Sequence, residues 1–308
     1  ELVGFAALMN GAVAYHRNRF RDARRELRDA VSNLRACAAV EWELDCAHIY
    51  DQMSAYGCGD YADLARTTPA LAEEARRRGR VWAYTMLSGF AAAPAWLTPD
   101  DPDGYRAQIA EVKLHWRPSE KPLWPDYVLL MGETMLAIYA GDPKSAFELL
   151  AAHHEVYSRS QLTRGSGIGS SGYAFHRSRA AAGTLRSADA TTSPALRRAA
   201  VGTLEEAMAT LRAHGIDRSL GMARAIEAAL ALERADRAAA RDALAGAVEH
   251  FDAGDTAILA ASARFRLGEL TGGERGDALI RTAEAELRAQ SVQNIDAMVE
   301  LHCPGCRA

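Results

Sequence analysis

Apolar residues recur at three- and four-residue spacing along most of the chain, and this period predicts α-helices. Runs of Val, Ile, Thr and aromatic residues in alternation with polar ones, which would indicate strands, are nearly absent. Gly, Pro and short polar segments break the helical pattern about every 20 residues. The pattern therefore predicts an all-α protein of about fourteen helices, joined by short turns into about seven antiparallel hairpins.

One spacing of small residues occurs three times. It consists of five positions in order: a small residue, Ala, Ala, Leu, and a small or polar residue. Two, eight, three and two other residues lie between successive positions. The three copies cover residues 11–30, 134–153 and 228–247. A turn falls inside each eight-residue gap, at Asn18, Gly141 and Ala235. Two antiparallel helices approach closely only where small residues face each other, so each copy predicts a tightly packed hairpin.

This spacing resembles the tetratricopeptide repeat (TPR), a helix–turn–helix unit of about 34 residues. A second resemblance lies in the last 70 or so residues, carried by AVEHF at 247–251, AASARFRLGEL at 260–270, RAQSVQN at 288–294 and Pro304-Gly305. This part is similar to the C-terminal arrays of bacterial STAND-type signalling ATPases, namely kinase–ATPase–TPR proteins and MalT-like regulators. The chain itself contains no GxxxxGK[ST], HRD or DFG motif.

The resemblance implies a TPR-like right-handed superhelix over residues 1–290, with residues 291–308 as a C-terminal capping tail. Such arrays bind partners on the concave face formed by the first helix of each hairpin. Carrying the repeat pattern over places seven residues on that face: Tyr15, His16, Met131, Met135, Tyr139, Met222 and Glu233.

The resemblance also implies a non-catalytic sensor or interaction module of a larger bacterial signalling protein. We expect a protein or peptide partner, which could be another domain of the same polypeptide. The alternative is a small-molecule effector, as in MalT-like regulators, and a closed pocket with convergent polar groups would favour it. An enzyme would need a cluster of perturbed titratable residues in a cleft, and no linear motif supplies one. We expect no cofactor and no metal.

Composition sharpens this picture. The chain has 63 Ala among 308 residues, and its 36 basic residues are 33 Arg and 3 Lys, which indicates a GC-rich bacterial genome. The net charge of -4 argues against nucleic-acid binding, which relies on a basic excess. Four arginines share one helical face among acidic residues, and this predicts a solvated surface: Arg17, Arg21, Arg24 and Arg28.

Cysteine content and the ends of the chain bear on location. Five Cys in a chain of this size favour a reducing cytoplasm over a disulfide framework. The sequence contains no window of 18 apolar residues, so we predict no membrane-spanning helix. Because the sequence begins at Glu1, we interpret it as a piece of a longer protein.

Four local features could carry chemistry. The segment GSGIGSSG at 165–172 could cradle phosphate, but it follows no strand and precedes no Lys, so we predict a flexible linker with a Ser N-cap. The CxxC of HCPGC at 302–306 lacks the second ligand pair that zinc requires, and we predict a frayed tail. His153 and His154 do not form a zinc-binding HExxH motif. His153 falls at a repeat core position, and we predict a packed or surface histidine pair.

The fourth feature is aromatic. Four Trp lie in a Pro-rich stretch and could anchor a partner, although packing of unequal hairpins is the favoured interpretation: Trp82, Trp96, Trp116 and Trp124.

Overall fold

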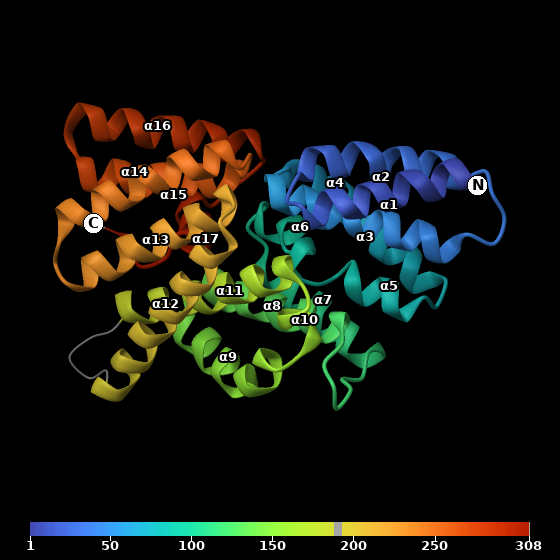
Figure 1. Cartoon of the computed structure of the whole chain (residues 1–308), viewed down its shortest axis with the longest axis horizontal. Helices are drawn as coiled ribbons and strands as arrows, with labels where there is room; N and C mark the ends of the chain where they lie inside the picture. The colour runs from blue at the N-terminus through green and yellow to red at the C-terminus, as the bar shows by residue number, and fades with distance from the viewer. Residues whose placement is uncertain (188–192, 308) are drawn as a thin grey trace. The chain divides into compact units, whose positions relative to one another are not determined.

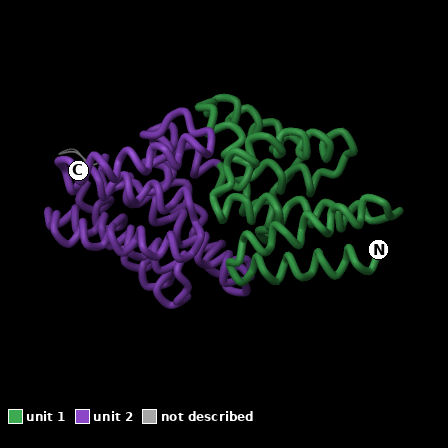
Figure 2. Tube along the Cα trace, turned by 90° about the horizontal axis from the view of Figure 1, so that it is seen from above, with its two compact units in different colours: residues 1–132 green, residues 133–308 purple. Residues whose placement is uncertain are grey.

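The computed structural model describes residues 1–187 and 193–307, and in these residues the chain forms seventeen α-helices, one short 3₁₀-helix and no strand (Figure 1). The prediction of an all-α protein is confirmed. Two compact units, Glu1–Gly132 and Glu133–Ala308, divide the chain (Figure 2). The continuous array over residues 1–290 stays a prediction.

Unit 1 consists of the helices before Gly132 and the first part of α8. Their bounds are α1 (Leu2–His16), α2 (Phe20–Leu34), α3 (Glu41–Cys58), α4 (Tyr61–Arg77), α5 (Val81–Met86), η1 (Phe90–Ala92), α6 (Pro94–Leu97), α7 (Pro102–His115) and α8 (Trp124–Tyr139). Helix α1 packs on α2, and α2 packs on α3. The seventeen α-helices of the described residues are three more than the fourteen or so that the pattern predicts.

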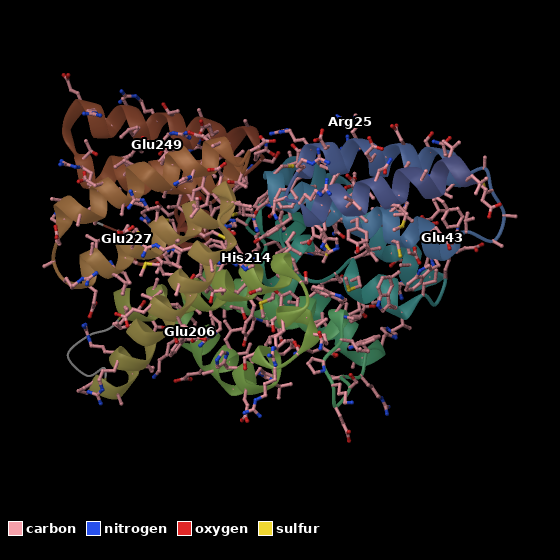
Figure 3. All side chains as sticks on the ribbon, viewed as in Figure 1. Arg25, Glu43, Glu206, His214, Glu227 and Glu249 are labelled. Carbon is pink, nitrogen blue, oxygen red and sulfur yellow. The ribbon has the colours of Figure 1, made fainter. Side chains whose placement is uncertain are left out.

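Unit 2 holds the end of α8 and nine further helices. Their bounds are α9 (Pro143–Ser158), α10 (Gln161–Arg164), α11 (Gly167–Arg186), α12 (Pro194–His214), α13 (Asp217–Glu233), α14 (Arg237–Ala253), α15 (Ala257–Thr271), α16 (Gly273–Ala289) and α17 (Ile295–His302). Neighbours along the chain pack on each other from α11 to α16. Charged side chains cover the outer faces, for example Glu206 on α12 and Glu249 on α14 (Figure 3).

The helix starts follow local chemistry. In α7, α9 and α12 an N-cap Asp or Ser precedes a Pro in the first helical turn, and the cap side chain accepts a hydrogen bond from the backbone N–H three residues on. Helix α14 uses Asp236 in the same way, with a distance of 3.0 Å to the Ala239 nitrogen. These caps satisfy backbone donors that the helix itself leaves unpaired.

All three predicted turns are present. Asn18, Gly141 and Ala235 each adopt a positive φ, at 57°, 83° and 59°, between helices that end and begin within four residues. The small residues of the first and third copies are buried, and Gly11 lies so close to α2 that an added Cβ would be 2.5 Å from the Leu27 Cγ. In the second copy His153 is exposed, so the core position of the repeat is not buried there, and of the two interpretations left open for His153 the surface one holds.

Two further predictions are corrected by packing. Residues 167–172 are helical rather than a linker, because α11 is buried along most of its length and tertiary contacts outweigh the low helix propensity of Gly and Ser. The predicted Ser N-cap is confirmed, since the Ser166 hydroxyl accepts a hydrogen bond from the Gly169 nitrogen at 3.2 Å.

The predicted solvated face of α2 is also wrong at Arg24, which is only 5% exposed. Its Nε donates to Asp51 at 2.9 Å, and its terminal nitrogens bind Asp60 and Asp63 of the α3–α4 hairpin. A buried guanidinium requires such compensation.

The four tryptophans of the Pro-rich stretch are half-buried and each has a partner within unit 1, which supports the packing interpretation. Trp82 lies against Trp42, Trp96 stacks on Tyr105, Trp124 contacts Tyr127 edge-on, and Trp116 donates to Asp126 at 2.8 Å.

Candidate functional site

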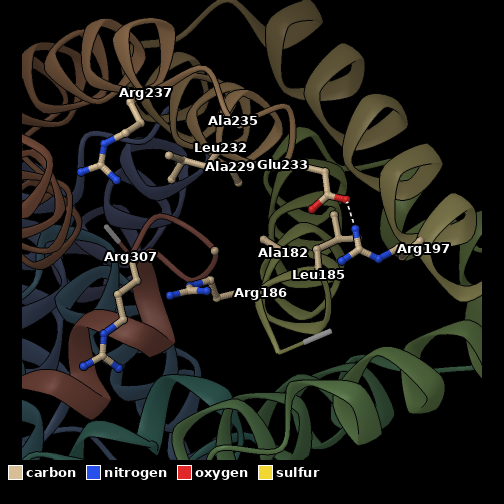
Figure 4. A pocket seen from close by; sticks show the side chains of 11 residues that line it. Ala182, Leu185, Arg186, Arg197, Ala229, Leu232, Glu233, Ala235, Arg237 and Arg307 are labelled. Atoms are coloured by element: carbon tan, nitrogen blue, oxygen red, sulfur yellow. Dashed lines mark hydrogen bonds and ion pairs between the residues drawn. The ribbon is translucent and has the colours of Figure 1, made fainter. Parts of the chain in front are cut away.

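A cavity of about 400 Å³ lies in unit 2 where four helix ends meet the C-terminal tail (Figure 4). Four arginines and one glutamate provide its charged lining: Arg186, Arg197, Arg237, Arg307 and Glu233. We call this cavity the arginine pocket. Its apolar lining includes Ala182, Leu185, Ala229 and Leu232.

The ends of four helices position the charged groups. Arg186 is the last residue of α11, and Glu233 is the last residue of α13. Arg237 is the first residue of α14, and Arg197 lies in the first turns of α12. A cation at the start of a helix faces the positive end of the helix dipole, so the placement of Arg237 does not serve helix stability.

The electrostatics of the pocket are unbalanced. Arg197 forms an ion pair with Glu233, and Figure 4 shows this pair on the opposite side of the pocket from the other three arginines. Within the described ranges 1–187 and 193–307, Arg186, Arg237 and Arg307 have no hydrogen bond or ion pair to an acidic side chain. The part of the charged lining that the structure describes therefore carries three more positive than negative groups.

A second hollow adjoins the arginine pocket and shares Arg186 and Arg307 with it. Its volume is about 490 Å³. Arg266, Glu300 and Tyr139 also line it, and Arg266 forms ion pairs with Glu300 and Glu269. In this second hollow Arg266 is compensated, and the carboxylate of Asp296 lines it together with Arg186 and Arg307.

The tail that carries Arg307 into the pocket is anchored. His302, Cys303 and Cys306 are at most 3% exposed, so the predicted frayed tail is wrong. The Arg266 Nε donates to the Cys303 carbonyl at 3.4 Å, and the Cys306 thiol lies 3.6 Å from the Ala225 carbonyl. Gly305 has a φ of +76°, which turns the tail against α11.

A buried polar cluster beneath the tail fixes α17 on α11. The Arg179 guanidinium, itself 2% exposed, donates to the Leu301 carbonyl at 3.2 Å and to the His176 Nδ1 at 2.8 Å, and it lies over the Phe175 ring. Burial and then the charge of Arg179 hold the pKa of His302 well below 6.5. The same causes lower the pKa of His176. Both histidines are therefore neutral at pH 7, and His176 can accept a hydrogen bond from the guanidinium.

The seven residues expected on a concave face lie in both units. Glu233 lines the arginine pocket and Tyr139 lines the adjoining hollow. In unit 1, Tyr15 and His16 form an aromatic cluster with Tyr50.

The three methionines of that set have no exposed surface in this structure: Met131, Met135 and Met222. Their assignment, with that of the other four, to one partner-binding face stays a prediction.

Sequence reasoning missed Arg186, Arg237 and Arg307, which have no acidic partner among the described residues. They are 51 and 70 positions apart, and nothing in a chain with 33 Arg distinguishes them except the placement of Arg237 at a helix start.

The other candidate chemistries have structural explanations. The His153 Nδ1 lies 2.9 Å from the Leu149 carbonyl, and His154 stacks on Tyr173. No group of three or more His, Cys, Asp or Glu side chains in the described part of the chain could hold a metal ion. Nor does any described helix combine the length and the apolar character that crossing a membrane requires.

Comparisons of the chain with protein-family models, with curated proteins and with solved structures find no match.

Proposed function

We propose that this chain is a non-catalytic interaction module of a larger bacterial signalling protein, and that it binds an acidic segment of a protein partner in the arginine pocket. The observation that carries the proposal is the gathering of Arg186, Arg237 and Arg307 around one cavity without acidic partners among the described residues. Guanidinium groups bind carboxylates through paired N–H donors, so such a cluster is suited to acidic ligands.

The composition of the pocket supports a binding role rather than catalysis. Its described lining holds no hydroxyl, thiol or imidazole group, and hence no nucleophile or general base other than Glu233, which is paired with Arg197. We therefore expect no kinase or hydrolase activity from the chain. Detection of ATP turnover in the purified chain would contradict this part of the proposal.

For the finer architecture we infer a TPR-like right-handed solenoid of about seven hairpins in a cytoplasmic protein, regulating an ATPase or kinase elsewhere in the same polypeptide. The repeated spacing, the three turns and the packing of successive helices from α11 to α16 support this inference. The sequence encoded upstream of Glu1 tests the association with an ATPase or kinase.

The binding proposal is tested by fluorescence anisotropy of the whole chain with labelled peptides rich in Asp and Glu, beside neutral peptides of equal length. The double variant Arg186→Ala, Arg307→Ala should lose most of the binding. Arg241→Ala, one turn beyond Arg237 on the exposed surface of α14 and not in the pocket lining, should bind normally. Equal affinity of the double variant and the unmodified chain would refute the proposed site.

A small-molecule effector is the second candidate. The pocket volume of about 400 Å³ falls in the range of roughly 300–1,000 Å³ that is usual for small-ligand sites. Small organic acids that displace the acidic peptides at much lower concentration than the peptides themselves would favour this candidate.

A further inference from the structure

We infer that the arginine pocket recognises a phosphoryl group on the partner, so that phosphorylation of the partner switches binding on. This inference rests on the proposed function and narrows the acidic segment to a phosphorylated one. Three observations support it: how many arginines lack an acidic partner among the described residues, which elements carry them, and which apolar residues line the pocket beside them.

The arginine pocket offers more guanidinium donors without acidic partners among the described residues than one carboxylate can engage. Three of the four lining arginines have no acidic side chain as partner in the described residues, while Glu233 compensates the fourth. All three side chains are exposed to solvent, and a single carboxylate has only two oxygens, so it would leave at least one of the three guanidinium groups without a direct partner. A phosphate monoester carries close to two negative charges near neutral pH and three acceptor oxygens, and so it matches three donors better.

The origin of the three groups favours a compact ligand with several acceptor directions. Arg186 comes from the end of α11, Arg237 from the start of α14, and Arg307 from the tail that is turned back by Gly305. A planar carboxylate offers acceptors in one plane, whereas the tetrahedral phosphoryl group offers acceptors in several directions, which suits arginines carried by separate elements (Figure 4). Arginine is the residue that binds phosphate through paired donors.

The surroundings favour a phosphorylated peptide over inorganic phosphate. Ala182, Leu185, Ala229 and Leu232 give the pocket apolar contact surface beside the charged groups, and the adjoining hollow continues from Arg186 and Arg307. Inorganic phosphate would use neither feature. A peptide would place its phosphoryl group at the shared arginines and its flanking residues along the two hollows.

The test uses the whole chain and three matched degenerate peptide libraries whose central residue is phosphoserine, serine or aspartate. We expect the phosphoserine library to bind at least about tenfold more tightly than the aspartate library. Equal binding of these two would overturn the phosphoryl inference and leave the acidic-partner function standing. Failure of all anionic peptides to bind would overturn both.

Competition identifies the source of the phosphoryl group. Inorganic phosphate and glycerol phosphate should displace the phosphopeptide only at concentrations far above its dissociation constant. If glycerol phosphate bound as tightly as the peptide, the ligand would be a small phosphate ester and the peptide part of the inference would be overturned.

Two variants give readouts of opposite sign, which misfolding cannot produce. Arg186→Lys keeps the charge but loses the paired donors, and it should weaken phosphopeptide binding severalfold. Glu233→Gln releases Arg197 and removes the only acidic group of the described lining, so it should strengthen binding. Weaker binding by the Glu233→Gln variant, with its helical circular dichroism unchanged, would refute the charge argument.

The pH dependence separates the two ligand chemistries. Among the described residues, the charged lining of the arginine pocket apart from Glu233 consists of arginines, which keep their charge over the accessible range, and the adjoining hollow adds the carboxylates of Asp296 and Glu300. A phosphate monoester takes up its second proton with a pKa near 6, so its affinity should fall between about pH 7 and about pH 5. The affinity of the aspartate library should change little over that interval.

Discussion

The close approach of α15 and α16 makes a sharp prediction about Gly268. A Cβ added at this position would lie 2.8 Å from the Gly276 carbonyl oxygen, 3.1 Å from the Ile280 nitrogen and 2.7 Å from the Ile280 Cγ1. The first two atoms are backbone, so a rotamer change cannot relieve the contact, and α15 and α16 must separate.

The magnitude follows from two opposing effects. Forcing an extra methyl group into a packed interface costs about 1–3 kcal/mol. Replacing Gly by Ala inside a helix contributes about 1 kcal/mol in the stabilising direction. The overlap at Gly268 with immovable backbone places its cost in the upper part of the range, so Gly268→Ala should lower the free energy of unfolding by about 1–2 kcal/mol.

The matched control is Gly202→Ala. Gly202 lies within α12 on the surface, and an added Cβ would meet no atom within 4 Å. The same chemical change should therefore raise the free energy of unfolding by about 0.5–1 kcal/mol. Urea unfolding of both variants, followed by circular dichroism, measures the two effects. If Gly268→Ala stabilised the chain as much as Gly202→Ala, the close approach would not exist as described.

Three further predictions concern titratable groups. Burial raises the pKa of Asp63, but its ion pairs with Arg24 and other arginines outweigh this and hold the pKa below 3.8. The ion pairs therefore stabilise the fold above pH 3.8, and this stabilisation is lost as the pH falls through the lowered pKa. Acid unfolding should show the loss in the unmodified chain, and the Asp63→Asn variant should lack it. His302 is held neutral by burial, so the unfolded chain binds the proton more readily below pH 6.5, and stability should fall there by up to about 1.4 kcal/mol per pH unit, less steeply in His302→Asn. Buried Cys303 and Cys306 should react with a thiol reagent only after unfolding, and reaction in the native chain would show that the tail is not anchored.

The sequence was sufficient for features encoded within a few residues of each other. The turns at Asn18, Gly141 and Ala235 were predictable because residues that tolerate or favour a break separate two helical patterns. Small residues at fixed spacing correctly located the tight hairpin contact at Gly11, because the close approach of two helices constrains residue size directly.

Features that depend on distant segments were missed for a common reason. The neighbours of Arg24 on its own helix suggested a solvated face, whereas its carboxylate partners are 27 to 39 positions away on other elements. The low helix propensity of residues 167–172 suggested a linker, whereas packing of α11 decided the conformation. In both cases burial, which local sequence does not encode, reversed the preference.

The arginine pocket shows how such non-local effects create a site. Arg307 follows a segment that looks like a disordered end, and it reaches the pocket only because α17 and the CPGC turn are buried against α11 and α13. The contact of Arg179 with the Leu301 carbonyl, and the burial of His302, Cys303 and Cys306, therefore have a consequence beyond stability. They fix the position of Arg307, one of the three lining arginines without an acidic partner in residues 1–187 and 193–307. A change that releases the tail should weaken anion binding even when Arg186 and Arg237 are untouched. Gly305 also lines the pocket, so the tail forms part of its wall. Deletion of residues 303–308 should therefore reduce anion binding more than Arg307→Ala does. An equal reduction would show that the arginine alone matters.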